Sequence, residues 1–90
     1  MSYSITPWTR KQAKRYGLEV KPSRKQGKKL DVFRGGDYIG SIGAQGMGDF
    51  GTYLLEKDQE YAKERRRLYH LRHKDGPKDS PSWLSKRLLW

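Results

Sequence analysis

The sequence predicts an α+β fold: a small three-stranded antiparallel sheet packed by an N-terminal helix and C-terminal helices, in one domain over residues 1–90. Three observations predict this class. A helix start at Thr6-Pro7 opens the chain, short alternating segments separated by turn formers occupy the middle, and apolar residues recur at helical spacing after residue 50. The expected order is therefore a helix, then strands, then helices.

The first helix is expected over residues 7–16. Thr6 suits the N-cap, and Pro7 suits the first helical position, where a missing N–H costs nothing. Gly17 then fits the left-handed position that often ends a helix. Beyond it, alternation of apolar and polar residues predicts strands, and Gly35-Gly36 predicts a hairpin turn. The expected strands are 18–21, 30–34 and 38–44.

Between the first two strands, residues 22–29 contain turn formers and no apolar side chain, so we expect a flexible loop there. After the sheet, Asp49 suits the N-cap of a helix over residues 50–57. The apolar stripe is interrupted near Asp58, which predicts a break before a longer helix at about 59–74. Ser80-Pro81 repeats the cap-plus-proline start and predicts a short last helix.

Composition limits the classes of function. The chain has no cysteine, which excludes disulfides and thiolate metal sites. It has no apolar run of the ~18 residues that span a bilayer and no secretory signal, so we expect no membrane partner and an intracellular location, or packaging in a particle assembled there. Three Trp, six Tyr and two Phe predict a small aromatic core rather than disorder.

The charge is unevenly distributed along the chain. The 20 Lys and Arg outnumber the 10 Asp and Glu, for a net charge of +10. Residues 10–29 hold nine basic groups and one acid, and residues 63–78 hold seven and two, whereas the segment between them is acidic. Two basic blocks of this kind are typical of a protein that binds a polyanion, above all nucleic acid.

We therefore expect non-enzymatic binding of DNA or RNA, with weak sequence specificity and no cofactor or metal. Lysine and arginine would neutralise phosphates and release counterions, and arginine also favours bidentate phosphate contacts. The alternative for the same residues is a solvated surface that keeps the protein soluble. The expected phosphate-contact residues are Arg10, Lys11, Lys14, Arg15, Arg24, Lys25, Lys28, Lys29, Arg66 and Arg67.

Three motifs suggest other chemistry. Residues 46–51 match G-x-G-x-x-G, but the chain is too short for a dinucleotide fold, and we expect these glycines to serve turns and close packing. Tyr38-Ile39-Gly40 is similar to the second strand of GIY-YIG nucleases, which leaves a minimal nuclease as an alternative, with its arginine among residues 65–67. His70 and His73 with Asp75 offer at most three metal ligands, so we expect them to favour the helix C-terminus instead.

Several segments together resemble a family of short uncharacterised proteins of large DNA viruses that infect algae and amoebae, and of related marine viruses. The resemblance implies a viral origin and adds a small virion structural or cement protein, bound to acidic virion proteins, as a further alternative. The segments that carry it are Ser4-Ile5-Thr6-Pro7-Trp8, the hairpin 30–44, Tyr61-Ala62, Glu64-Arg65-Arg66-Arg67-Leu68-Tyr69, Arg72-His73 and Leu88-Leu89-Trp90.

Overall fold

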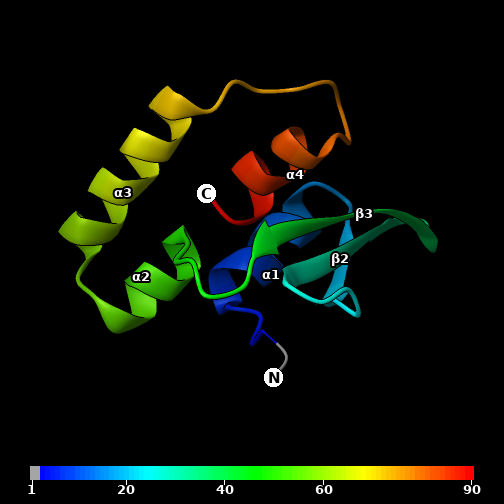
Figure 1. The fold of residues 1–90 in the computed structure, drawn as a ribbon, viewed down its shortest axis with the longest axis horizontal. Helices are drawn as coiled ribbons and strands as arrows, with labels where there is room; N and C mark the ends of the chain where they lie inside the picture. The colour runs from blue at the N-terminus through cyan, green and yellow to red at the C-terminus, as the bar shows by residue number, and fades with distance from the viewer. Residues whose placement is uncertain (1–2) are drawn as a thin grey trace.

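The computed structural model describes residues 3–90 and has the predicted α+β fold, with a three-stranded antiparallel sheet, an N-terminal helix and C-terminal helices (Figure 1). Helices α1 and α4 pack against the sheet, and α2 and α3 form an arm beyond the C-terminal end of β3. The elements are α1 (Pro7–Arg15), β1 (Glu19–Pro22), β2 (Lys28–Arg34), β3 (Asp37–Ala44), α2 (Phe50–Glu56), α3 (Gln59–Arg72) and α4 (Pro81–Leu88).

Each helix begins at a side-chain cap, because a short polar side chain accepts a hydrogen bond from an otherwise unpaired N–H of the first turn. The predicted caps Thr6, Asp49 and Ser80 are confirmed, and Asp58 caps α3 at the predicted break between α2 and α3. Gly17 follows α1 with a φ of +69°, as predicted for the left-handed position.

The sheet has the order β1-β2-β3, with Val20 opposite Val32 and Leu30 opposite Ile42. The loop predicted over residues 22–29 is shorter in the structure. Pro22 belongs to β1, and both Lys28 and Lys29 belong to β2, so the connection is only residues 23–27. Pairing across the sheet extends both strands into a stretch with no apolar residue, which local pattern alone does not indicate.

The core lies between the sheet and the helices that cover one of its faces. Leu30, Val32 and Ile42 of the sheet are fully or almost fully buried against Leu84 and Leu88 of α4. Polar contacts fix α1 to the end of α4 as well: Thr9 Oγ1 donates to the Leu88 carbonyl at 2.7 Å. None of the helices within residues 3–90 combines the length and apolar character needed to cross a lipid bilayer.

We expect Gly51→Ala to destabilise the protein, although alanine is the better helix former by about 1 kcal/mol. A Cβ at residue 51 would overlap Oγ1 of Thr6, which is buried and caps α1. Overpacking of this kind costs about 1–3 kcal/mol, so the clash should outweigh the helix gain. Urea unfolding measures the change.

Gly40→Ala is the matched control, because its added Cβ would lie 3.8 Å from Leu84 Cδ1, an ordinary contact. The two variants make the same chemical change and should differ in their urea midpoints. If both variants have the same urea midpoint as the wild type, the close packing of Thr6 against Gly51 is contradicted.

Candidate nucleic-acid interface

The first basic block lies on two elements. The side chains of Arg10, Lys11, Lys14 and Arg15 are exposed on α1, which packs against β1 at one edge of the sheet. Arg24, Lys25 and Lys28 are exposed around the β1–β2 connection. Within residues 3–90, none of these seven side chains forms an ion pair. Their charge is therefore available to a partner.

Asp31 anchors the connection that carries part of this block. Its carboxylate accepts hydrogen bonds from Ser23 Oγ at 2.6 Å, Ser41 Oγ at 2.7 Å and the Arg24 N–H at 3.2 Å. Burial by itself would raise the pKa of Asp31, but these donors outweigh it and hold the pKa below its usual value. The connection is thus tied to β2 and β3 by a charged acceptor.

The prediction that Lys29 contacts phosphate is wrong. Its side chain is buried, with 3% of the residue exposed, and Nζ lies 2.8 Å from Asp49 Oδ2. Asp49 also accepts from the Tyr3 hydroxyl at 2.7 Å and from the Thr52 N–H at 2.9 Å. Lys29 therefore neutralises a buried carboxylate and has no charge to offer a ligand.

Burial by itself would raise the pKa of the Asp49 carboxyl. The hydrogen bonds from Lys29, Tyr3 and Thr52 outweigh that effect, so the pKa lies below its usual value. Burial and the hydrogen bond to Asp49 raise the pKa of the Tyr3 hydroxyl. This hydroxyl therefore stays protonated and donates to Asp49. Asp49 is therefore a structural carboxylate at the start of α2.

Most of the second basic block lies on α3, and its predicted contact residues Arg66 and Arg67 are exposed but already have partners within the chain. Arg67 forms a bidentate pair with Glu64, with Nη2 at 2.7 Å from Oε1. Arg66 donates to the Trp90 main-chain oxygen, and its guanidinium lies 5.4 Å from the centre of the Phe50 ring. Glu64 thus neutralises part of the charge of this block.

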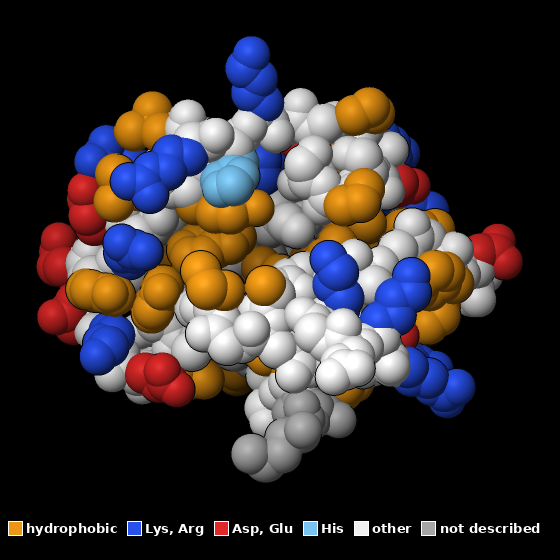
Figure 2. All heavy atoms as spheres, in the orientation of Figure 1, with side chains coloured by type: hydrophobic (Ala, Val, Ile, Leu, Met, Phe, Trp, Pro, Cys, Tyr) orange, Lys and Arg blue, Asp and Glu red, His pale blue; other side chains and the backbone are white. Residues whose placement is uncertain are grey.

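A cleft of about 320 Å³ separates α3 from the end of β3 and from α4; we call it the α3 cleft. Figure 2 shows hydrophobic side chains gathered in a hollow there, with Lys and Arg on both sides. No acidic side chain within residues 3–90 lines it. The lining includes the apolar side chains of Leu68, Leu89 and Trp90, the basic side chains of Arg65 and Arg72, and the rings of Tyr69 and His73.

Three of these rings form a column. Tyr69 stacks on Trp90 with ring centres 4.6 Å apart and an interplanar angle of 9°. His73 stacks on Tyr69 at 4.1 Å and 21°. Because both neighbours are near-parallel to Tyr69 and do not stack on each other, they occupy its two faces. His73 is exposed and forms the outer end of the column.

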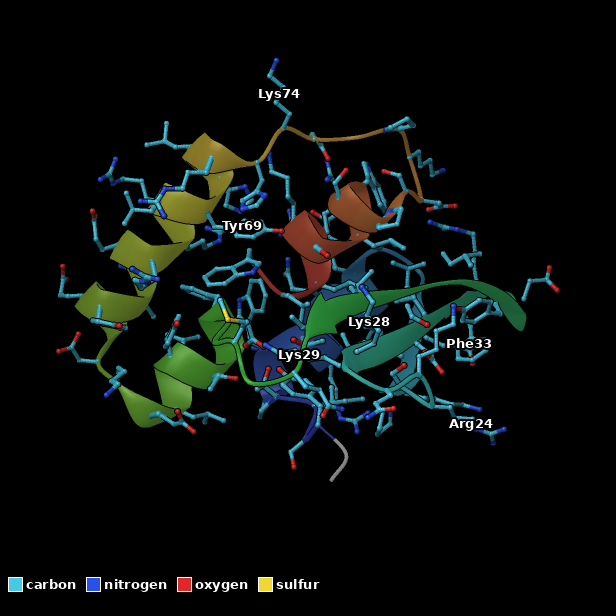
Figure 3. All side chains as sticks on the ribbon, in the orientation of Figure 1. Arg24, Lys28, Lys29, Phe33, Tyr69 and Lys74 are labelled. Atoms are coloured by element: carbon cyan, nitrogen blue, oxygen red, sulfur yellow. The ribbon has the colours of Figure 1, made fainter. Side chains whose placement is uncertain are left out.

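Both basic blocks contribute to this side of the molecule. Lys28 pairs in the sheet with Ala44, which lines the α3 cleft, so Lys28 lies beside the sheet side of the cleft. Lys74 extends from the end of α3, whereas Arg24 lies at the far side of the sheet (Figure 3). Arg65 and Arg72 lie on the α3 side of the cleft. The fold therefore divides the first block between two regions.

The blocks also meet on the other side of α3, in a hollow of about 350 Å³ lined by Arg15, Arg66 and Lys86. Asp75 lies in that hollow and forms a bidentate pair with Arg87, with Oδ2 at 2.7 Å from Nη2. This pairing holds the pKa of Asp75 below its usual range. A fixed carboxylate makes this hollow less suited to a phosphate than the α3 cleft.

The sequence interpretation missed the lining of the α3 cleft. Arg65, Tyr69, Arg72 and His73 were not selected, although with Leu68 they follow the 3, 4, 7 and 8 spacing of one helix face. That spacing was a usable signal. Among these residues only Leu68 fits the expected apolar stripe of a packed helix, and only the fold shows that this face borders an open cleft.

The remaining sequence motifs either serve packing or lie apart from α3. The glycine-rich segment serves local packing, since Gly46 has a φ of +86° and a Cβ at Gly48 would overlap the Tyr53 ring. Tyr38 pairs with Phe33 at the hairpin end of the sheet, far from α3 and its three consecutive arginines (Figure 3). Residues 3–90 hold no cluster of three or more His, Asp or Glu placed to bind a metal ion.

Neither a family model, nor a curated protein, nor a solved structure matches this chain. Its resemblance to short viral proteins stays a prediction.

Proposed function

We propose that this protein binds nucleic acid through a basic surface centred on α3 and extended across the α3 cleft by Lys28. The observation that carries the proposal is the placement of unpaired cations on both sides of a cleft that no acid lines within residues 3–90. A phosphate backbone is a dense row of negative charge, so cations on two sides of a groove can hold it in place.

The alternative explanation, a surface charged only for solubility, fits less well. Such surfaces usually intersperse both signs of charge, as α3 does at Glu64 and Arg67. The cleft side departs from that pattern because Arg65, Arg72 and Lys28 form no ion pair within the described residues. Unbalanced cations beside an apolar hollow create a local positive potential, which steers polyanions toward it.

A fluorescence anisotropy titration with labelled oligonucleotides at rising salt tests the proposal. We expect binding at ~50 mM salt that weakens steeply as salt increases, since each phosphate contact contributes about −0.9 to the slope of log K against log salt for duplex DNA and about −0.7 for single strands. Absence of binding to single- and double-stranded DNA and RNA at that salt would contradict the proposed function. Binding to acidic protein alone would favour the structural alternative.

A further inference from the structure

We propose that an unpaired base of a single-stranded nucleic acid stacks on the outer ring of the column, at the mouth of the α3 cleft, while Arg65 and Arg72 bind phosphates of the same strand. This inference rests on the proposed function and specifies its substrate class. The aromatic column and its basic rim together carry the inference, because single-strand binding commonly combines a cationic groove with aromatic rings on which bases stack.

The first step is the chemistry of the lining. Leu68, Leu89 and Trp90 give the cleft an apolar wall, and its volume of about 320 Å³ lies at the lower end of the usual ~300–1,000 Å³ for small-molecule sites. A flat, unpaired base can stack at the mouth of this cleft, whereas a base pair inside a duplex presents no free face. The mouth of the cleft therefore favours an unpaired base.

A base needs a free ring face in the column on which to stack. Tyr69 has a ring on each side, so it cannot accept a base directly. His73 is exposed at the outer end of the column, and a base stacking there would add a fourth ring. Tyr69 and Trp90 support the imidazole from below. The pre-formed column lowers the cost of ordering the histidine side chain when a base binds.

Two arginines supply positive charge for phosphate contacts. Arg65 and Arg72 lie seven residues apart on α3, two helical turns along the same side of the cleft. Within residues 3–90, neither forms an ion pair that would have to be broken for a phosphate contact. Their planar guanidinium groups suit bidentate contacts to phosphate oxygens. The same surface thus offers one stacking ring and two phosphate donors.

The test compares two ligands with equal charge. One is a labelled oligothymidine of about 20 nucleotides, longer than the ~4–16 that one small single-strand-binding domain covers. The other is an abasic sugar-phosphate strand of the same length. We expect the base-containing strand to bind roughly 5- to 150-fold more tightly, which corresponds to the usual contribution of one stacked base. A duplex of the same length should also bind more weakly than the oligothymidine.

Exposed positions allow variants that keep the fold. His73→Ala should remove the preference for the base-containing strand, and His73→Phe should retain it, because phenylalanine preserves a stacking ring. Leu71→Ala is the matched control, since Leu71 is 70% exposed near the same end of α3 but does not line the cleft. Circular dichroism confirms that each variant is folded.

The outcomes separate the two proposals. Equal binding of the abasic strand and oligothymidine would overturn base stacking on His73 and leave nucleic-acid binding intact. A loss of preference in Leu71→Ala as large as in His73→Ala would also overturn it. No binding of either strand or of duplex at ~50 mM salt would contradict the proposed function itself. Preference for the base-containing strand that only His73→Ala removes supports the inference.

Discussion

Asp49→Ala should reduce the free energy of unfolding by about 3–5 kcal/mol, because it leaves the Lys29 ammonium buried without its partner. The same change removes the cap of α2 and the acceptor of the Tyr3 hydroxyl. A domain of this size has only ~5–15 kcal/mol of stability in total, so much of the chain should unfold at moderate temperature. Urea unfolding followed by circular dichroism measures the loss.

Two controls identify the cause. The double variant Lys29→Met with Asp49→Ala should recover part of the stability, because it removes the unpaired buried charge. Glu64→Ala breaks an exposed pair and should leave the urea midpoint nearly unchanged. If Asp49→Ala costs no more than Glu64→Ala, the buried pair has no structural importance. If the double variant is as unstable as Asp49→Ala, the lost cap and Tyr3 contact explain the effect instead.

The same carboxylate predicts a pH dependence of stability. The pKa of Asp49 is lower in the folded protein than in the unfolded chain, so the unfolded state binds protons more readily. The stabilisation is fully present above the ordinary pKa of an aspartate and is lost as pH falls through the lower folded value. Wild-type stability should fall in this acidic range, and the Asp49→Ala variant should lack that component. Equal acid sensitivity of the two proteins would contradict the assignment.

Charge reversal at the α3 cleft should have the largest effect on binding. Replacing Lys28, Arg65 and Arg72 with glutamate removes three cations from around the cleft. If each contacts one phosphate, the salt slope should fall by about 2 for a single strand and the affinity by roughly 10²-fold or more at moderate salt. Anisotropy titrations at several salt concentrations measure both quantities.

The matched control reverses three charges on α1 by replacing Arg10, Lys11 and Lys14 with glutamate. These side chains are also exposed, but α1 packs against β1, whereas the cleft lies at the end of β3, the strand at the other edge of the sheet. The control changes the net charge by the same amount and should leave the salt slope close to the wild-type value. Equal losses in the two triple variants would show that net charge alone drives binding and would contradict the α3 cleft as the contact surface.

Much of the fold could be predicted because its determinants are local. A cap such as Thr6 or Asp49 acts on N–H groups two or three residues away, so the residue types next to each other in the chain suffice to indicate a helix start. The break at Asp58 follows from a local loss of apolar residues in the same way. The strand ends at Pro22 and Lys28 were missed because strand pairing, which is not local, extends them.

The basic site was predicted only as a list of charges. In the sequence, Lys29 is one of the cations of the first block. Only packing shows that Asp49, 20 residues further along the chain, neutralises it. Sequence places Arg65 and Tyr69 on one helix face, and only the position of that face beside β3 and α4 turns it into the wall of a cleft. Pairing and burial depend on neighbours that are distant in the chain.

The sequence by itself determined the α+β class, the helix starts, the helix break and the excess of positive charge, because each follows from residue types within a few positions of one another. Only the tertiary structure decided which cations remain free. It buried Lys29, paired Arg67 with Glu64 and left Arg65, Arg72 and Lys28 around an apolar cleft. The physical reason is that a charge acts on a ligand only if folding leaves it exposed and without an opposite charge beside it.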